Sequence, residues 1–362
     1  MELEILFGMF GEGGTATLAG LVIGLAFGIF AQRSRFCLRS AVIEFSRGTI
    51  GSRVSIWLLV FGAAVAGTQG LILSGTLDVS EARQLTAEGS LSGAVIGGLM
   101  FGAGMVFARG CASRLLVLSG TGNLRALVSG LILTVVAQSS LRGALSPVRE
   151  WLAGLWTVSG GDSRDLIALL GFGGNAPFIF GLIVVGLALY YARRSRVGRW
   201  TVFGSLGVGT MIAVGWLVTY TISSHSFEPV GVKSISFIGP STDTLMGLIN
   251  QPTLPLVFDL GLVPGVFAGA FLAAAFSREL KIQCFSIENS PMPRYIVGAI
   301  MMGFGGMLAG GCAVGAGVTG GAVFSLTAWV ALSAMWAGAG IADYVVDRRR
   351  DEKFAKTPLP VK

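Results

Sequence analysis

Long hydrophobic runs, separated by shorter polar segments, recur along the whole chain. A helix needs roughly 20 apolar residues to cross a bilayer core, and about nine segments reach or approach that length. These predicted spans lie at roughly residues 15–32, 54–75, 91–108, 123–141, 176–193, 200–222, 254–276, 294–309 and 323–346. The third and the eighth are short, and each runs into an apolar segment broken by glycine. The pattern predicts an all-α polytopic membrane protein with re-entrant half-helices after the two short spans.

The composition of the 362 residues supports a membrane protein, with 53% hydrophobic and 12% charged residues. A soluble domain carries about 25% charged residues, so this chain cannot cover a water-facing surface of its size. The net charge of +7 would suggest a nucleic-acid partner in a soluble protein. Here basic loops that fix orientation explain it better, and we expect membrane lipid rather than nucleic acid around the chain.

The basic residues predict the orientation of the spans. Lys and Arg gather in the segments 33–53 and 193–199 and in the tail 347–362, whereas the alternate segments 76–90 and 223–253 hold one base each. Basic loops stay in the cytoplasm, which predicts a periplasmic N-terminus and a cytoplasmic tail. The first apolar run has neither a basic segment before it nor a convincing cleavage site, and we expect a retained helix.

The two short spans belong to an internal repeat. Residues 96–112 align without gaps on 297–313, with eight of seventeen positions identical and a shared Gly-Cys-Ala end. An extra span between the halves gives the second half the opposite polarity, which predicts an inverted repeat. Cys111 and Cys312 should then face each other near the bilayer centre. The predicted parts of this single membrane domain, 1–362, are a first repeat at 15–141, a connecting segment at 142–214, a second repeat at 215–346 and the tail at 347–362.

Gly-Cys-Ala follows each short span, at residues 110–112 and 311–313. Transporter sites form where helices break near the midplane, because the N-termini of half-helices present free N–H groups and positive dipole ends. Arg109 adds positive charge in the first half, whereas Gly310 takes its place in the second. The sequence predicts an anion site between these two turns.

Thiols favour a soft ligand that contains sulfur. A cysteine offers a weak S–H donor and a polarizable sulfur, which suits the terminal sulfur of thiosulfate better than sulfate or phosphate. A covalent persulfide relay is the alternative, because a thiolate near a helix N-terminus is more nucleophilic. Soft thiolates would also accept Cu(I), and a copper channel stays open as a third reading. No cysteine or histidine spacing predicts a metal site, and no fingerprint predicts ATP or NAD. We expect no cofactor and no enzyme activity.

The sequence resembles the YeeE/YedE sulfur-transport family of bacterial inner-membrane proteins over nearly its whole length. The resemblance rests on Ala-Arg-Gly-Cys-Ala and Ala-Gly-Gly-Cys-Ala after the short spans, Arg-x-Arg-Phe-Cys at 33–37 and Ser-Phe-x-Gly-Pro-Ser at 236–241. It implies an inverted-repeat fold with an hourglass-like interior and uptake of thiosulfate, handed along Cys111, Cys312 and Cys37 from outside to inside. It also implies a cytoplasmic partner, a small TusA-like sulfur carrier protein.

Selenium species or another reduced sulfur anion remain alternative substrates under this resemblance. The fourth thiol, Cys284, lies outside the repeat alignment, and we expect it to be structural. The predicted substrate-binding residues are Cys111, Cys312, Cys37, Gly110, Gly311, Arg109, Ala112 and Ala313.

Overall fold

The protein is a bundle of apolar helices. The computed structural model describes residues 2–171, 173–226, 230–250, 252, 254–284 and 292–348, with side chains from residue 6 onward. Nine helical segments in this part are long and apolar enough to cross a membrane: Leu6–Ser46, Ser52–Leu73, Leu91–Gly120, Leu124–Arg142, Ala176–Arg194, Arg199–His225, Phe258–Phe276, Met292–Ala322 and Leu326–Arg348. The prediction of an all-α, multi-pass membrane protein is confirmed.

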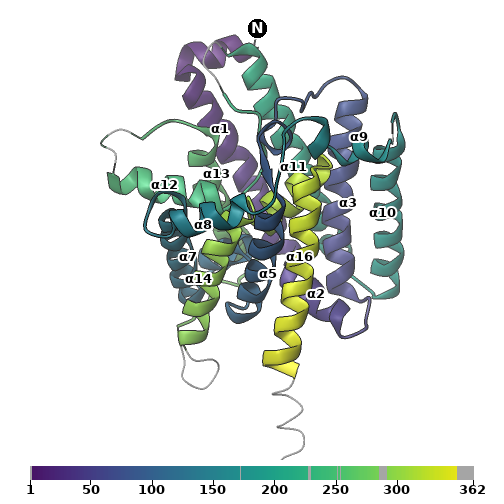
Figure 1. Ribbon diagram of the computed structural model, residues 1–362, viewed down its shortest axis with the longest axis vertical. Coiled ribbons are helices and arrows are strands. Elements are labelled where there is room, and N and C mark those ends of the chain that lie inside the picture. The colour runs from purple at the N-terminus through teal and green to yellow at the C-terminus, as the bar shows by residue number, and fades with distance from the viewer. Residues whose placement is uncertain are drawn as a thin grey trace, which may run out of the picture.

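The longer helices form the body of the molecule, and several shorter ones, such as α8 (Ser146–Gly154), α9 (Leu166–Leu170) and α12 (Ile238–Asn250), lie across or beside them (Figure 1). The longer helices are α1 (Glu2–Ser34), α3 (Ser52–Leu73), α5 (Leu91–Phe107), α7 (Leu124–Arg142), α10 (Ala176–Arg194), α11 (Arg199–His225), α13 (Phe258–Phe276), α14 (Met292–Leu308) and α16 (Leu326–Ala342). The shorter elements are α2 (Leu38–Ser46), α4 (Arg83–Thr86), α6 (Ala112–Gly120), α8 (Ser146–Gly154), η1 (Asp162–Arg164), α9 (Leu166–Leu170), α12 (Ile238–Asn250), η2 (Ala313–Thr319), α15 (Gly320–Ala322) and η3 (Asp343–Arg348). Strands β1 (Gly89–Ser90) and β2 (Thr157–Val158) pair antiparallel, Gly89 opposite Val158.

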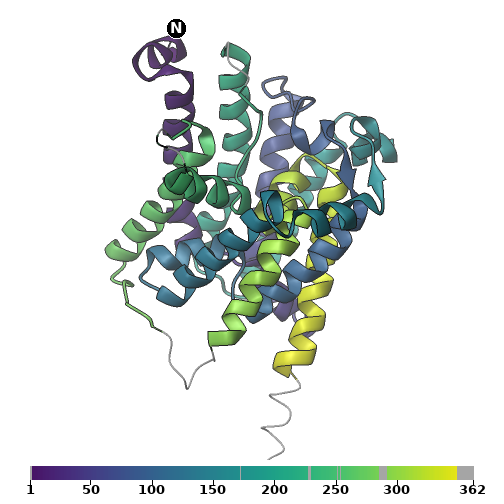
Figure 2. The same cartoon turned by 60° about the vertical axis from the view of Figure 1, so that its left-hand side comes forward.

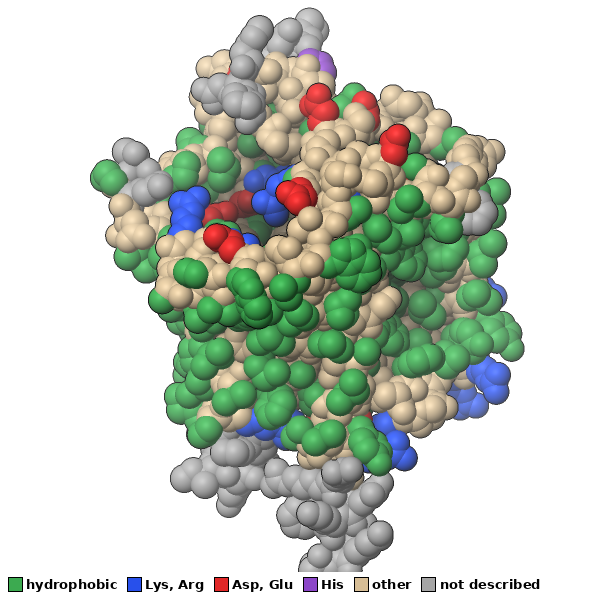
Figure 3. Space-filling view, in the orientation of Figure 1, with side chains coloured by type: hydrophobic (Ala, Val, Ile, Leu, Met, Phe, Trp, Pro, Cys, Tyr) green, Lys and Arg blue, Asp and Glu red, His purple; other side chains and the backbone are tan. Residues whose placement is uncertain are grey.

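The molecular surface has the banded charge pattern of a membrane protein. Hydrophobic side chains cover the middle of the face drawn in Figure 3, with Lys and Arg below them. Asp and Glu lie above this belt, some of them beside Lys and Arg in a hollow. The start of α1 and the lower end of α16 lie at opposite ends of the molecule in both ribbon views (Figures 1 and 2). An odd number of crossings gives this arrangement.

Glycine explains how closely the central helices approach each other. On α1, glycines spaced by four residues lie against backbone oxygens of α13, and glycines on α13 lie against α1 in return. The interleaved positions are Gly20, Gly24, Gly28, Gly261, Gly265 and Gly269. Small residues at this spacing let helix backbones pack directly in a membrane, where the hydrophobic effect does not drive helices together.

Helices α5 and α14 cross each other through glycines in a reciprocal way. A Cβ atom on Gly97 would lie 2.5 Å from the backbone oxygen of Gly305, and one on Gly298 would lie 2.8 Å from that of Gly104. Gly97 aligns with Gly298 in the repeat, and Gly104 with Gly305. Each contact is therefore the image of the other, as in an interface that follows a two-fold axis.

The same exchange relates the other helix pairs. Helix α1 packs on α13 and α11 packs on α3, while α5 packs on α16 and α14 packs on α7. When each helix is replaced by its equivalent in the other half, the α1–α13 pair becomes the α11–α3 pair, and the α5–α16 pair becomes the α14–α7 pair. Helix α10 has no equivalent in the other half and packs on α3. It lies in the connecting segment, for which the sequence predicts an extra span.

Two short helices lie in segments that the sequence analysis treated as loops. Helix α2 lies in the expected basic loop 33–53, and α12 lies in the expected outer loop 223–253. The helix α2 packs on α3 and α16, and α12 packs on α13 and α7. These two segments are therefore part of the packed protein, and they bring Phe36, Cys37 and much of the 236–241 motif into its interior, while Arg33 and Arg35 stay exposed.

Candidate functional site

A short helix begins directly after each of the two repeat cysteines. Cys111 is the residue before α6, with φ −83° and ψ 169°, and Cys312 is the residue before η2, with φ −83° and ψ 178°. The turn that precedes each cysteine uses a positive φ, 56° at Arg109 and 81° at Gly310. The two turns thus share a left-handed residue two positions before the cysteine, a conformation that glycine adopts readily.

Both thiols are enclosed by the protein and bind the start of their own helix. The side chains of Cys111 and Cys312 are each 1% exposed. The Cys111 sulfur lies 3.3 Å from the hydroxyl oxygen of Ser113, and the Cys312 sulfur accepts the backbone N–H of Gly315 at 3.3 Å. An anion that reached either sulfur would meet the positive end of a short helix.

The third thiol lies against the first. Cys37 precedes α2 with an extended backbone and is 8% exposed, and its thiol lies next to that of Cys111, close enough for the two to interact. The expected order from outside to inside placed Cys312 between these two residues, whereas the structure brings Cys37 next to Cys111. The reason is α2, which folds back into the protein and delivers Cys37 beside Cys111 instead of leaving it on a cytoplasmic loop.

The repeat equivalent of Cys37 is an aromatic residue. Because α2 begins at Leu38 and α12 at Ile238, the residue before the second helix, Phe237, is the equivalent of Cys37. Phe237 is 1% exposed, and its ring centroid lies 5.3 Å from that of Phe27 on α1. The second half therefore places a buried phenylalanine, packed on Phe27 of the first half, where the first half places a second thiol.

Cys312 and η2 connect to the segment before α12 through polar contacts. The hydroxyl of Thr319, at the end of η2, donates to the backbone oxygen of Ile235 at 2.7 Å. A Cβ atom on Gly315 would overlap the hydroxyl of Ser236. The 236–241 motif thus packs directly against the first turn after Cys312, which the sequence resemblance alone did not reveal.

Positive charge near the thiol pair comes mainly from Arg114 rather than Arg109. Arg114 is half-buried and its guanidinium charge acts on both Cys37 and Cys111, whereas Arg109 is exposed. One Arg114 nitrogen lies 3.5 Å from the side-chain oxygen of Gln32, whose amide donates to Glu279 at 3.1 Å. The burial of Arg114 depends on the helices packed around α6 and is not visible in the sequence.

A separate apolar cavity of about 190 Å³ lies between α6, α7, α12 and α13. Ala112, Phe237 and Phe267 are among its lining residues, and the wall is largely hydrophobic. An apolar wall does not suit a doubly charged anion.

The remaining cysteine is set apart from the other three. Cys284 is exposed, and the residue before it, Gln283, pairs with Asn123 through both backbone and side chain. Within the described ranges, no three His, Cys, Asp or Glu residues are grouped as metal ligands. The structure thus brings Cys37 to Cys111, builds matching turns at Gly110 and Gly311, and leaves Cys284 outside.

The chain matches the family model described as sulphur transport over residues 33–341. It is 25% identical to the thiosulfate transporter TsuA of Escherichia coli (strain K12), over 93% of this chain and 96% of that protein. It is 27% identical to the thiosulfate transporter TsuA of Spirochaeta thermophila, over 86% of this chain and 93% of that protein. These names agree with the expectation of a transport role rather than an enzyme. The match covers most of the chain and includes all four cysteines, so this protein belongs to the YeeE/YedE sulphur transport family.

Proposed function

We propose that this protein takes up thiosulfate across the bacterial inner membrane, and that three buried thiols hold the anion in turn. The observation that carries the proposal is the pair of matching turns at which Cys111 and Cys312 each begin a short helix. The names of the two relatives supply the substrate. Gly110, Gly311, Ala112 and Ala313 would shape the two turns, with Arg109 at the rim of the first.

The basic segments support a periplasmic N-terminus and a cytoplasmic tail. In that orientation the reciprocal helix packing supports an inverted repeat of 15–141 and 215–346, joined through 142–214. The inner half of the molecule would then contain Cys37 and Cys111, near the inner end of α1. The outer half would contain Cys312. The proposed order of contact is therefore Cys312 first, followed by Cys111 and Cys37.

The geometry supports weak and successive binding. Each thiol can donate an S–H bond to the terminal sulfur of thiosulfate, while the N–H groups at the helix starts attract its oxygens. Such bonds are individually weak, which allows the anion to leave each position, as conduction through several sites requires. Arg114 adds a charge close to the inner thiol pair. No ionisable acid is required in this scheme.

Thiosulfate released in the cytoplasm would meet its acceptor there. We propose a small TusA-like sulfur carrier protein as this partner, on the basis of the family resemblance, and membrane lipid around the apolar belt. Selenium species and other reduced sulfur anions carry the same soft atom and are the alternative cargo. A comparison of thiosulfate, sulfate and selenite binding to the purified protein separates these substrates.

The contact between Cys37 and Cys111 favours a second candidate, sulfur transfer through a persulfide. In that reaction a cysteine thiolate attacks the terminal sulfur of thiosulfate, a new S–S bond forms on the protein, and sulfite leaves with the electron pair of the broken S–S bond. The neighbouring thiol could then accept the sulfur atom. Mass spectrometry after exposure to thiosulfate would detect one added sulfur atom on a cysteine peptide only for this reaction.

Uptake of labelled thiosulfate by cells or proteoliposomes tests the transport proposal. Cys111→Ala and Cys312→Ala should abolish uptake and Cys37→Ala should lower it strongly, because each removes one binding position from the path. Cys284→Ala is the matched control and should transport like the unmodified protein, since Cys284 is exposed and apart from the site. Normal uptake by both Cys111→Ala and Cys312→Ala would rule out the proposed path.

A further inference from the structure

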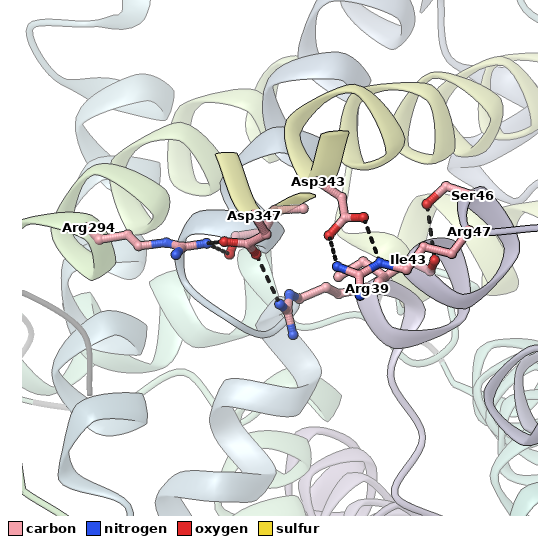
Figure 4. A network of polar contacts seen from close by, with 8 residues as sticks. Arg39, Ile43, Ser46, Arg47, Arg294, Asp343 and Asp347 are labelled. Atoms are coloured by element: carbon pink, nitrogen blue, oxygen red, sulfur yellow. Dashed lines mark hydrogen bonds and ion pairs between the residues drawn. The ribbon is translucent and has the colours of Figure 1, made fainter. Parts of the chain in front are cut away.

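Two arginines share one carboxylate at the inner end of the proposed path. Arg294, at the start of α14, donates to Asp347 at 2.7 Å, and Arg39 of α2 forms an ion pair with the other oxygen of Asp347 at 3.7 Å. Figure 4 shows the Asp347 carboxylate between these two guanidinium groups. On the same segment, Asp343 separately pairs with Arg47 through two hydrogen bonds of 3.1 and 3.2 Å.

The two guanidinium groups have more N–H donors and more positive charge than the Asp347 carboxylate can pair with. The Nε atoms of Arg39 and Arg294 are buried and have no hydrogen-bond partner among the described residues. The Arg294 side chain is 10% exposed, so water does not easily compensate for the missing bond. A buried donor without a partner is costly. Two positive charges against one carboxylate also leave a net positive charge, which a doubly charged anion would balance.

This cluster adjoins the inner thiol pair. Arg39 lies two residues after Cys37 on the first turn of α2, and its charge acts on Cys37. Arg294 also donates to the backbone oxygen of Val106 at 3.2 Å, near the end of the helix that leads to Cys111. An anion that left Cys111 and Cys37 toward the inside would therefore meet Arg39 and Arg294 next.

We propose that Arg39 and Arg294 form an anion-binding site that the Asp347 carboxylate occupies in this conformation, and that the transported thiosulfate displaces this carboxylate as it leaves the inner thiols. The inference rests on the proposed function. Arg side chains bind oxyanions through paired N–H groups, and the three oxygens of thiosulfate could engage donors that a single carboxylate cannot. Asp347 acts as a competitor, so it keeps the exit site from holding the anion too tightly.

Anion binding to purified full-length protein in detergent tests this site, with sodium thiosulfate and sodium sulfate as the probes. Asp347→Asn removes the competing charge with little change of shape. Thiosulfate should then bind about tenfold tighter, which is the gain expected if Asp347 occupies the arginine site about nine tenths of the time. Asp343→Asn is the matched control, because it removes the same charge from the same segment and leaves Arg39 and Arg294 paired. Its affinity should be unchanged. Adding Arg39→Gln to Asp347→Asn should abolish the gain.

Equal affinity of Asp347→Asn and the unmodified protein would overturn the inference, as would an equal gain in Asp343→Asn. If Asp347→Asn is unstable, its thermal midpoint should be restored by sulfate but not by chloride, and failure of both salts would show that Asp347 is only structural. Uptake is measured separately. If the unmodified protein takes up thiosulfate but Asp347→Asn binds it no more tightly, only this anion site is refuted. If Asp347→Asn binds thiosulfate more tightly but the unmodified protein takes up none, only the proposed function is refuted.

Discussion

The thiol of Cys37 lies beside the thiol of Cys111, although the two residues precede different short helices, α2 and α6. Mild oxidation of a Cys284→Ala protein should therefore join Cys37 to Cys111, because a disulfide forms only between cysteines whose Cα atoms lie within about 7 Å. Peptide mass spectrometry identifies the linked pair. A dominant link between Cys111 and Cys312, or no Cys37 link at all, would contradict the described arrangement of the inner thiols.

The burial of Arg114 predicts a larger role for it than for Arg109. Arg114→Gln should weaken thiosulfate binding about tenfold, since it removes a charged donor beside both inner thiols. Arg109→Gln is the control and should have a much smaller effect, because Arg109 is exposed. Binding titrations on the two purified variants measure this difference. The electrostatic account of the inner site would fail if the two variants weakened binding equally.

The crossing of α5 and α14 predicts a sharp penalty for one added methyl group. Gly298→Ala would force a Cβ atom to within 2.8 Å of the Gly104 backbone oxygen, and overpacking of this kind typically costs about 1–3 kcal/mol. Gly186→Ala on α10 is the matched control, because nothing lies within 4 Å of its Cβ position. Thermal unfolding in detergent should show a lower midpoint for Gly298→Ala only. Equal midpoints would mean that the two helices do not approach so closely.

Arg164 should hold the outer loops to α16. Its side chain is 7% exposed, donates to the hydroxyl of Thr327 at 2.7 Å and also bonds the backbone oxygen of Ala87. Burial lowers the pKa of Arg164, yet a guanidinium keeps its charge at neutral pH. Arg164→Met leaves the Ala87 backbone oxygen without this donor and removes one of the two hydrogen bonds of the Thr327 hydroxyl, which costs about 1–3 kcal/mol.

The matched control for that substitution is Arg83→Met, at an exposed arginine of the neighbouring helix α4. Its unfolding midpoint should stay within about 1 °C of the unmodified protein, as expected for a surface change of a few tenths of a kcal/mol. Midpoints that fall equally in both variants would show that the buried hydrogen bonds of Arg164 add no stability.

Hydrophobic length predicted the nine spans, because the membrane imposes one strong constraint on every helix that crosses it. The glycine-broken segments also predicted α6 and η2. The residues directly after each short span are too apolar for an exposed loop, which indicated a short helix inside the protein. Helices α2 and α12 were missed for the opposite reason. Each is too short for a span, and its helical form depends on packing against α3 or α13.

The site was only partly predictable for the same reason. The repeat singled out Cys111 and Cys312, whose turns match in the structure. The sequence could not place Cys37 against Cys111, because that contact requires α2 to fold inward. It also could not pair Arg39 with Asp347, since the two residues come from the first and last parts of the chain and meet only through the packing of α2 and α16.

Thiosulfate should cross the membrane whole, held by thiols rather than split by them. Proteoliposomes supplied with thiosulfate that carries different labels on its two sulfur atoms distinguish the two possibilities. We expect both labels to enter in equal amounts and Cys312→Ala to abolish the entry of both. Entry of the terminal sulfur alone, with labelled sulfite left outside, would contradict it.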